Sequence, residues 1–99
     1  MAEVKYSARA QADFERLFEF LAAENPRGAT AAVGAIRNGV EVLARHPLIG
    51  RPVEHGFHEL VISRGSTGYV ALYEYLPVED IAIVQALRHQ REAGFQGTG

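Results

Sequence analysis

The side chains best suited to chemistry lie together near the C-terminus, in the run Arg88-His89-Gln90-Arg91. Metal-free cleavage of RNA needs a base for the 2′-hydroxyl, cations for the charged transition state and an acid for the leaving oxygen. His89 could be either proton carrier, because an imidazole titrates near neutral pH, and Arg88 and Arg91 could supply the charge. The same guanidiniums could instead grip an acidic partner or a polyanion, since they bind carboxylates and phosphates in a fixed bidentate geometry.

Three more residues could complete a catalytic set, and the whole set also has a simpler interpretation. Arg64 lies in a glycine-rich turn and could reach outward, while Glu54 or Glu59 could be a second proton carrier. Arg64 could instead be a solvated turn charge, the role that we favour for it. His89 could merely cap a strand end, and Arg88 could pair with a neighbouring carboxylate. For His89 and Arg88 we rank these structural roles first, partner binding second and catalysis third.

The composition argues against several other chemistries. The chain of 99 residues has no cysteine, which removes thiol nucleophiles and disulfides. His55 and His58 have no third ligand at a suitable spacing, so we expect no metal, and we expect no cofactor. A formal net charge of −2 lacks the basic excess of a dedicated nucleic-acid binder. No apolar run approaches the ~18 residues that span a membrane, and the N-terminus lacks a secretory signal, so we expect a cytoplasmic protein without a membrane partner.

These residues need a scaffold, and the spacing of apolar residues predicts one. Residues 3–6 suit a short strand, and Ser7 is placed to cap a helix. The first helix carries apolar residues at steps of three and four from Ala10 to Leu21, and Asn25-Pro26 ends it and opens a second. The second helix repeats the pattern from Ala29 to Leu43. Helices joined by so short a break should form an antiparallel hairpin.

Four residues inside these helices need a separate interpretation. Asp13 and Arg16 are assigned to the polar faces of the first helix, away from its apolar stripe. Gly34 and Gly39 fall inside the second helix, where each costs about 1 kcal/mol relative to alanine. Either that loss is simply tolerated, or the missing side chains let another part of the chain approach closely.

Three candidate strands follow a stiff loop over residues 47–52, in which Arg51 could brace the loop by hydrogen-bonding carbonyl groups. They cover residues 57–63, 69–76 and 81–87, and the last is apolar on both faces apart from Gln85, as in a central strand. The pattern predicts an α+β fold with an N-terminal strand, an antiparallel helical hairpin and a three-stranded antiparallel meander, and with both helices on one sheet face. We expect one domain over residues 1–95 and a flexible tail over residues 96–99.

The second of these strands is rich in tyrosine on one face. Tyr69, Tyr73 and Tyr75 alternate there with Ala71. On a half-buried sheet such tyrosines are core residues with their hydroxyls at the rim. If that face is uncovered, it would instead offer a partner an apolar platform with hydrogen-bonding groups.

Three groups of residues resemble the RelE/ParE superfamily of toxins from type II toxin–antitoxin systems. They are Ser7-x-x-Ala10-x-x-Asp13-Phe14 at the start of the first helix, His46-Pro47-x-x-Gly50-Arg51-Pro52 at the end of the second, and Tyr69-x-x-x-Tyr73 followed by Arg88-His89-x-x-Arg91. The resemblance spans residues 3–95. It is nearer to the ParE branch, in which the helix hairpin and a loop ending in Gly-Arg-Pro are typical.

The resemblance implies a toxin that a cognate antitoxin masks. ParE-like members poison DNA gyrase, and RelE-like members cleave mRNA on the ribosome. We therefore expect a gyrase inhibitor that acts by binding rather than as an enzyme, with toxin and antitoxin as partners in a hetero-oligomer. The predicted target contacts are Arg88, His89, Arg91 and Phe95, and the predicted antitoxin contacts are Phe14, Leu17, Tyr69, Tyr73 and Tyr75.

Two alternatives stay open. A ribosome-dependent mRNA endonuclease would use Arg64, His89 and Arg91, and a non-toxic paralogue would only bind an antitoxin. RelE-like nucleases carry an arginine near the position of Val70, and often a C-terminal tyrosine where this chain has Phe95. Valine cannot stabilise a phosphate and phenylalanine has no hydroxyl, so both differences count against the ribonuclease. Val70 also departs from ParE-like toxins, which often carry an arginine at a similar place.

Overall fold

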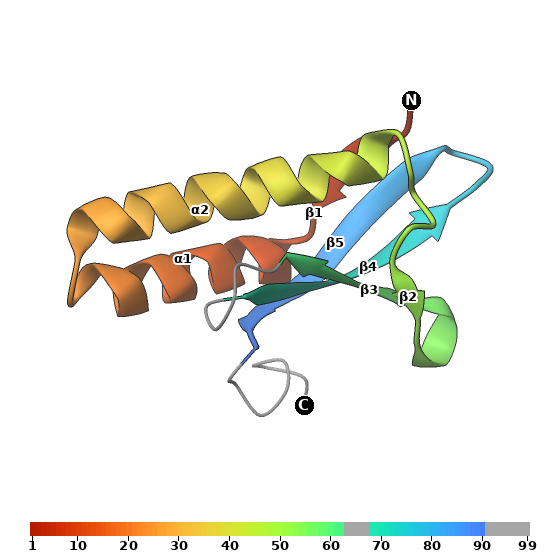
Figure 1. Ribbon diagram of the computed structural model, residues 1–99. Helices are drawn as coiled ribbons and strands as arrows, with labels where there is room; N and C mark the ends of the chain where they lie inside the picture. The colour runs from red at the N-terminus through yellow and green to blue at the C-terminus, as the bar shows by residue number, and fades with distance from the viewer. Residues whose placement is uncertain (63–67, 91–99) are drawn as a thin grey trace.

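The chain folds as a layer of two helices against a layer of sheet (Figure 1). The computed structural model describes residues 1–62 and 68–90. In chain order its elements are β1 (Glu3–Tyr6), α1 (Ala8–Ala22), α2 (Pro26–Val40), the 3₁₀ helix η1 (Glu41–Ala44), β2 (Arg51–Pro52), the 3₁₀ helix η2 (Glu54–Gly56), β3 (His58–Ile62), β4 (Tyr69–Leu76) and β5 (Ile81–His89).

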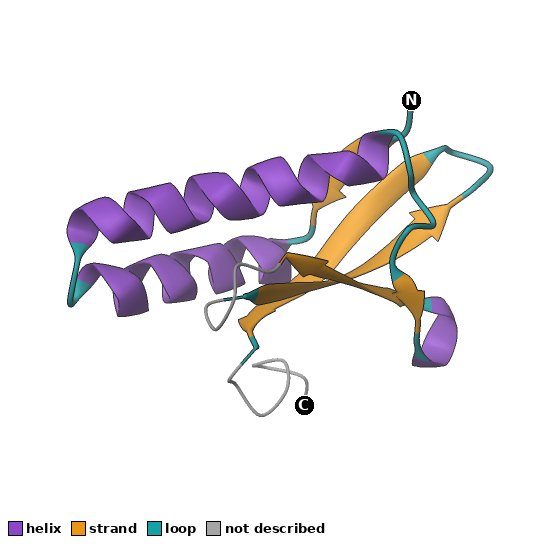
Figure 2. Cartoon of the chain, in the orientation of Figure 1, coloured by secondary structure: helices purple, strands orange, loops and turns teal. Residues whose placement is uncertain are grey.

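Both helices lie on the same side of the sheet, as Figures 1 and 2 show. The strand order is β1-β5-β4-β3-β2, with β1 parallel to β5 and every other neighbouring pair antiparallel. The predicted α+β fold is therefore confirmed. Strand β2 was not predicted, because two residues are too few to show a period of two. It pairs with the beginning of β3 and widens the predicted sheet to five strands.

Side-chain caps set the beginning of both helices. Ser7 Oγ accepts a hydrogen bond from the Ala10 N–H at 3.1 Å, and Asn25 Oδ1 accepts one from the Gly28 N–H at 3.1 Å. Pro26 lies in the first turn of α2, where a backbone N–H has no partner inside the helix. The short connection between the helices makes them the antiparallel hairpin that the apolar spacing predicts (Figure 1).

The hydrophobic core lies between this hairpin and the sheet. Phe14 and Leu17 of α1 and Ile36 of α2 pack in one cluster with Tyr73 of β4. Burial of one large apolar side chain contributes roughly 1.5–3 kcal/mol, so this layer supplies most of the stability of the fold. Phe18 differs from the prediction, because it belongs to the periodic apolar pattern but is exposed.

Strand β5 continues two residues beyond its predicted end at residue 87. Pairing with β4 extends to His89, and the Gln90 N–H then donates a hydrogen bond to the Gly68 carbonyl oxygen at 3.0 Å. Strand β3 begins at His58, one residue later than predicted, and its predicted end at residue 63 lies outside the described residues. The extension of β5 matters most, because it places the candidate chemistry inside a strand.

A β-bulge interrupts the pairing of β4 with β5. Leu72 lies opposite Ala86 and Tyr73 lies opposite Val84, which leaves Gln85 as the extra residue of β5. A bulge bends its strand and increases the local twist. The last residues of β5 are therefore directed differently from those of a regular strand.

Candidate functional site

Arg88 and His89 close strand β5, and they lie on opposite faces of the sheet. The register places Arg88 opposite Val70 and His89 opposite Tyr69. Tyr69 belongs to the core on the helix side, and successive residues of a strand alternate between faces. His89 therefore lies on the helix-covered face and Arg88 on the helix-free face. The expected cluster of these two side chains is not found, and Arg91 lies outside the described residues.

Both side chains are half-buried and contact the end of the sheet. The His89 ring meets the Tyr69 ring edge to face, with centroids 5.3 Å apart and an interplanar angle of 84°. Burial raises the pKa of Tyr69 above its ordinary value of 10.0, so its phenol stays protonated further into alkali. Arg88 Nη1 donates hydrogen bonds to the carbonyl oxygens of His89 and Gln90, each at 3.3 Å. The guanidinium thus folds over the end of its own strand.

The two carboxylates considered as second proton carriers do not join His89. Glu59 of β3 lies on the helix-free face, since its neighbour Leu60 packs against the core. Glu54 lies in η2 beside His55, with 3.8 Å between its Oε2 and the Nε2 of the imidazole. In the part of the chain that the structure describes, neither carboxylate forms an acid–base pair with His89.

Arg51 braces its loop through a carboxylate rather than through carbonyl groups as predicted. Its Nη2 donates to Glu59 Oε1 at 2.6 Å, which ties β2 to β3. The Arg51 side chain is mostly exposed, so this ion pair adds little free energy but fixes the geometry of the loop. Arg64 and Phe95, which the sequence analysis also proposed for the site, lie outside the described residues.

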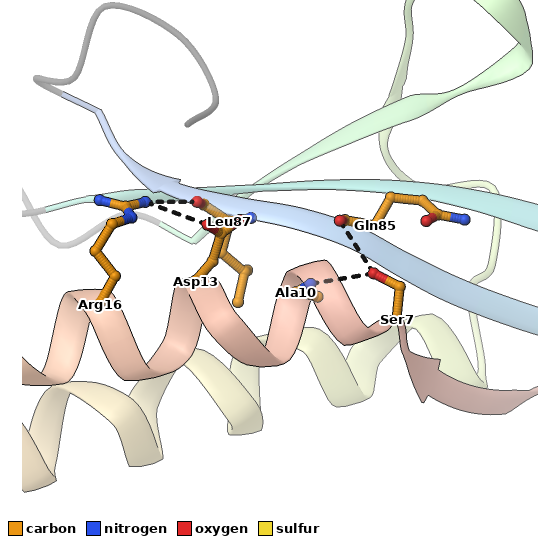
Figure 3. A network of polar contacts seen from close by, with 6 residues as sticks. All are labelled: Ser7, Ala10, Asp13, Arg16, Gln85 and Leu87. Atoms are coloured by element: carbon orange, nitrogen blue, oxygen red, sulfur yellow. Dashed lines mark hydrogen bonds and ion pairs between the residues drawn. The ribbon is translucent and has the colours of Figure 1, made fainter. Parts of the chain in front are cut away.

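The N-terminus of α1 completes the outer edge of β5 where strand β1 ends (Figure 3). Strand β1 pairs with β5 as far as Tyr6, which lies opposite Val84. The Ser7 N–H then donates to the Val84 carbonyl oxygen at 2.9 Å, and Ser7 Oγ donates to the Gln85 carbonyl oxygen at 3.1 Å. A helix-capping residue thereby satisfies backbone groups of the strand at the bulge.

Asp13 and Arg16 continue this edge one step further, at Leu87. Asp13 Oδ2 accepts a hydrogen bond from the Leu87 N–H at 2.8 Å, and Arg16 Nη2 donates one to the Leu87 carbonyl oxygen at 3.2 Å. The same Nη2 lies 3.6 Å from Asp13 Oδ1. Asp13 is only 5% exposed, and a buried carboxylate is costly unless it has such partners. We call Asp13, Arg16 and Leu87 the helix–strand clasp.

Assigning Asp13 to a polar helix face was wrong, although the sequence held a signal of its burial. Asp13 follows Ala10 by three residues and precedes Leu17 by four, and both of these are buried. Residues at those steps share one helix face, so Asp13 lies in the apolar stripe. A charged residue there indicates a specific buried partner. That partner lies 74 residues later, which spacing alone cannot identify.

A second feature is a largely apolar groove between the helix hairpin and the sheet. It has a volume of about 420 Å³. Ile62 at the end of β3 and Tyr69 at the start of β4 form its sheet side. The helices contribute mainly small residues, which leave room for another chain to approach. We call it the hairpin groove, and its helical lining includes Leu21, Ala29, Ala32 and Ala35.

The residues predicted to contact an antitoxin are mostly core residues in this structure. Phe14, Leu17 and Tyr69 are at most 8% exposed, and Tyr73 has no exposed surface. Tyr75 is half-buried and donates a hydrogen bond from its hydroxyl to Asp80 Oδ1 at 2.6 Å. The tyrosine-bearing face is therefore packed under the helices, as the core interpretation of these residues expected. Their role in antitoxin binding stays a prediction, but four of them offer a partner little surface.

Residues 1–62 and 68–90 contain neither a metal-binding cluster nor a membrane-spanning helix. No group of three or more histidine, aspartate or glutamate side chains in these ranges could hold a metal ion. Within the same ranges, neither helix is sufficiently long and apolar to cross a membrane. His58 instead packs against Tyr73, with ring centroids 5.4 Å apart and an interplanar angle of 27°.

Comparison with known proteins gives concordant results from sequence and from structure. The model of a family described as the ParE toxin of the type II toxin–antitoxin system parDE matches residues 4–94. Toxin RelE3 of Caulobacter vibrioides is 33% identical over 92 residues, which cover 93% of this chain and 98% of that protein.

Two solved structures have a similar fold. One, described as a chromosomal ParDE TA system from P. aeruginosa, has a TM-score of 0.76 at 22% identity and covers 90% of this chain and 96% of its own. The other, the toxin–antitoxin complex RelBE2 from Mycobacterium tuberculosis, has a TM-score of 0.66 at 21% identity and covers 90% and 98%. At these identities the structural likeness shows the fold alone.

Proposed function

The chain belongs to the ParE toxin family of type II toxin–antitoxin systems, and from this premise we propose that it inhibits DNA gyrase by binding and is neutralised by a cognate antitoxin. Gyrase is the target that the resemblance to ParE-like toxins implies. Such a toxin would act in the cytoplasm, as a single domain over residues 1–95.

One observation favours a toxin that acts by binding over one that acts by catalysis. His89 lies on the helix-covered face of the sheet, while Arg88 and the candidate carboxylate Glu59 lie on the other. General acid–base catalysis needs both proton carriers within hydrogen-bond reach of one substrate. The described residues do not bring such a pair together. Arginine at a strand end is instead well suited to carboxylate or phosphate groups of a macromolecular target.

The end of β5 is the proposed target contact. Arg88 presents its guanidinium on the helix-free face, and His89 contributes its ring beside Tyr69. The proposed contact also includes Arg91 and Phe95, which follow β5 in the chain.

The hairpin groove is the proposed place for the antitoxin. An amphipathic helix binds by laying its apolar face in a hydrophobic groove, and this groove has an apolar lining and about 420 Å³ of space. The small helical residues of the groove allow close approach, while Ile62 offers a larger apolar side chain on the sheet side. The two solved structures with this fold are described as toxin–antitoxin systems, which supports a partner of this kind in a hetero-oligomer.

Pulse labelling after induced expression in bacteria tests the proposed function. DNA synthesis and protein synthesis are followed separately in the same culture. Early loss of DNA synthesis, with covalent gyrase–DNA complexes, is the expected result. Continued growth with the intact protein present would contradict it and leave a non-toxic paralogue that binds an antitoxin.

The alternative of ribosome-dependent mRNA cleavage has one observation in its favour. The relative with 33% identity is named Toxin RelE3. Early loss of protein synthesis, with mRNA cut within codons, would support that alternative against gyrase inhibition. Purified gyrase then provides the direct test, because the chain should inhibit supercoiling without ribosomes present.

A further inference from the structure

The residue before Arg88 is held at both of its backbone groups by side chains of a helix. Leu87 donates its N–H to Asp13 at 2.8 Å and accepts from Arg16 at 3.2 Å through its carbonyl oxygen (Figure 3). In a regular sheet a neighbouring strand would fill these places. Here strand β1 has already ended opposite Val84, and two side chains of α1 replace it.

The clasp lies next to the bulge that redirects the end of β5. The bulge at Gln85 lies two residues before Leu87 and changes the direction of the strand. Ser7 holds the carbonyl oxygen of Gln85 itself at 3.1 Å. The bulge and the clasp together determine where the following residues point.

A strand edge can be closed without a buried charge, yet the clasp uses a buried carboxylate. Asp13 is a carboxylate that is 5% exposed within the apolar face of α1, where alanine or leucine would pack at no desolvation cost. Its charge is compensated by Arg16 at 3.6 Å and by the Leu87 N–H. A charge-assisted hydrogen bond is shorter and stronger than a neutral one, so this pair fixes Leu87 more firmly than a hydroxyl or an amide would.

We infer that Asp13 and Arg16 are positioning residues that act through the backbone of Leu87 to hold Arg88 and His89 for contact with the target. This inference rests on the proposed function for its biological meaning. Its structural content is independent, because the clasp must restrain the end of β5 whatever the target is. Neither Asp13 nor Arg16 needs to touch the target itself.

The test compares variants that loosen the clasp with a variant that loosens the fold elsewhere. Asp13→Asn keeps the shape of the side chain and removes its charge, and Asp13→Ala removes the acceptor. Ile36→Val thins the fully buried core from α2, the helix that carries neither Asp13 nor Arg16, and so provides a control for stability. Glu15→Gln removes an exposed carboxylate from the same helix and controls for charge.

The first measurement is inhibition of purified gyrase, made under conditions in which each variant is fully folded. We expect Asp13→Asn to lose about tenfold in inhibitory potency and Asp13→Ala more, while both controls stay near wild type. Two further variants test Arg16. Arg16→Ala removes the cation, and Arg16→Lys keeps a positive charge. Inhibition by Arg16→Lys that is close to wild type, with a clear loss in Arg16→Ala, would support the charge-assisted contact. Equal losses in Asp13→Asn and Ile36→Val would overturn the inference, because they would trace the effect to stability.

The second measurement is amide hydrogen exchange, which reads the clasp without any target. We expect the Leu87 and Gln90 amides, which donate to Asp13 and to the Gly68 carbonyl oxygen, to exchange about tenfold or more faster in Asp13→Asn than in Ile36→Val. Unchanged exchange would overturn the inference. If the wild-type chain fails to inhibit gyrase, the proposed function fails, and this second measurement still decides whether the clasp positions the end of β5.

Discussion

The backbone N–H of Gly50 donates a hydrogen bond to the Tyr73 hydroxyl at 2.9 Å in the buried interior, across 23 residues of chain. Tyr73 has no exposed surface, so its phenol has been taken out of water to meet this partner. A Cβ at position 50 would lie only 2.7 Å from Tyr73 Cε1 and 2.8 Å from the Glu59 carbonyl oxygen. Glycine is therefore required for the loop after α2 to approach β4 so closely, and the loop is fixed to the core.

Tyr73→Phe should lower the free energy of unfolding by about 1–3 kcal/mol, because it leaves the buried Gly50 N–H without its acceptor. Urea denaturation measures the change. Tyr69→Phe is the matched control, since Tyr69 lies on the same face of the same strand and is also buried. A loss in Tyr69→Phe as large as that in Tyr73→Phe would show that the Gly50 contact is not the cause.

The two glycines inside α2 should respond in opposite ways to alanine. A Cβ at Gly39 would lie 2.8 Å from Ile62 Cγ2, whereas a Cβ at Gly34 would have no neighbour within 4 Å. Both substitutions gain about 1 kcal/mol of helix propensity, but overpacking at Gly39 costs roughly 1–3 kcal/mol. We expect Gly34→Ala to stabilise the protein and Gly39→Ala to be less stable than it by about 1–3 kcal/mol. Thermal unfolding of the two variants side by side checks this, and equal midpoints would refute the close approach at Gly39.

Most of the fold could be predicted because its signals are local. The apolar spacing of α1 and α2, with the caps Ser7 and Asn25 at their beginnings, predicts the hairpin without knowledge of the sheet. Strand β4 likewise shows its buried face in the alternation of tyrosine and alanine. The bulge could not be predicted, because β5 is apolar on both faces and so shows no clear alternation that the extra residue Gln85 would interrupt.

The candidate site was harder to predict because it depends on pairing between distant strands. Arg88 and His89 were expected to follow a strand that ended at residue 87, where their side chains could converge. Pairing with β4 instead continues to His89, and an extended strand separates neighbouring side chains onto two faces. The clasp was missed for the same physical reason. The partner of Asp13 is a backbone group, which leaves no trace in residue types.

Stability should fall in alkali, because the fold holds its tyrosines in the protonated form. Burial is the main cause of the raised pKa of Tyr6, Tyr69 and Tyr73, and the hydrogen bond to Asp80 is the main cause for Tyr75. Unfolded tyrosines ionise near pH 10.0, so above that pH the unfolded chain releases protons before the folded chain does. This contribution to stability is complete below about pH 10 and is lost as the pH rises through the higher folded pKa values.

Urea midpoints measured at intervals between pH 8 and pH 11.5 would follow the loss, with the range chosen to bracket the ordinary tyrosine pKa of about 10. We expect the tyrosine contribution to the free energy of unfolding to stay constant up to about pH 10 and to decline above it. Tyr75→Phe should decline less steeply than wild type, because one of the four protonated phenols is absent. A midpoint that did not fall on the alkaline side would contradict the prediction.

Arg88 and His89 should contribute unequally to inhibition of the target, because they lie on opposite faces of the sheet. Arginines that anchor an interface typically cost 2 kcal/mol or more when truncated, so Arg88→Ala should reduce inhibition of gyrase about 30-fold. His89→Phe keeps an aromatic ring beside Tyr69 and should cost no more than about threefold, since it preserves packing at the strand end. Arg45→Ala, which removes an exposed arginine at the end of η1, is the control and should leave inhibition unchanged.

A nuclease that used His89 as a proton carrier would behave differently, because loss of a general acid or base lowers the rate roughly 10²–10⁴-fold. A larger loss in His89→Phe than in Arg88→Ala, measured as mRNA cleavage on ribosomes, would therefore replace the binding mechanism with the catalytic one.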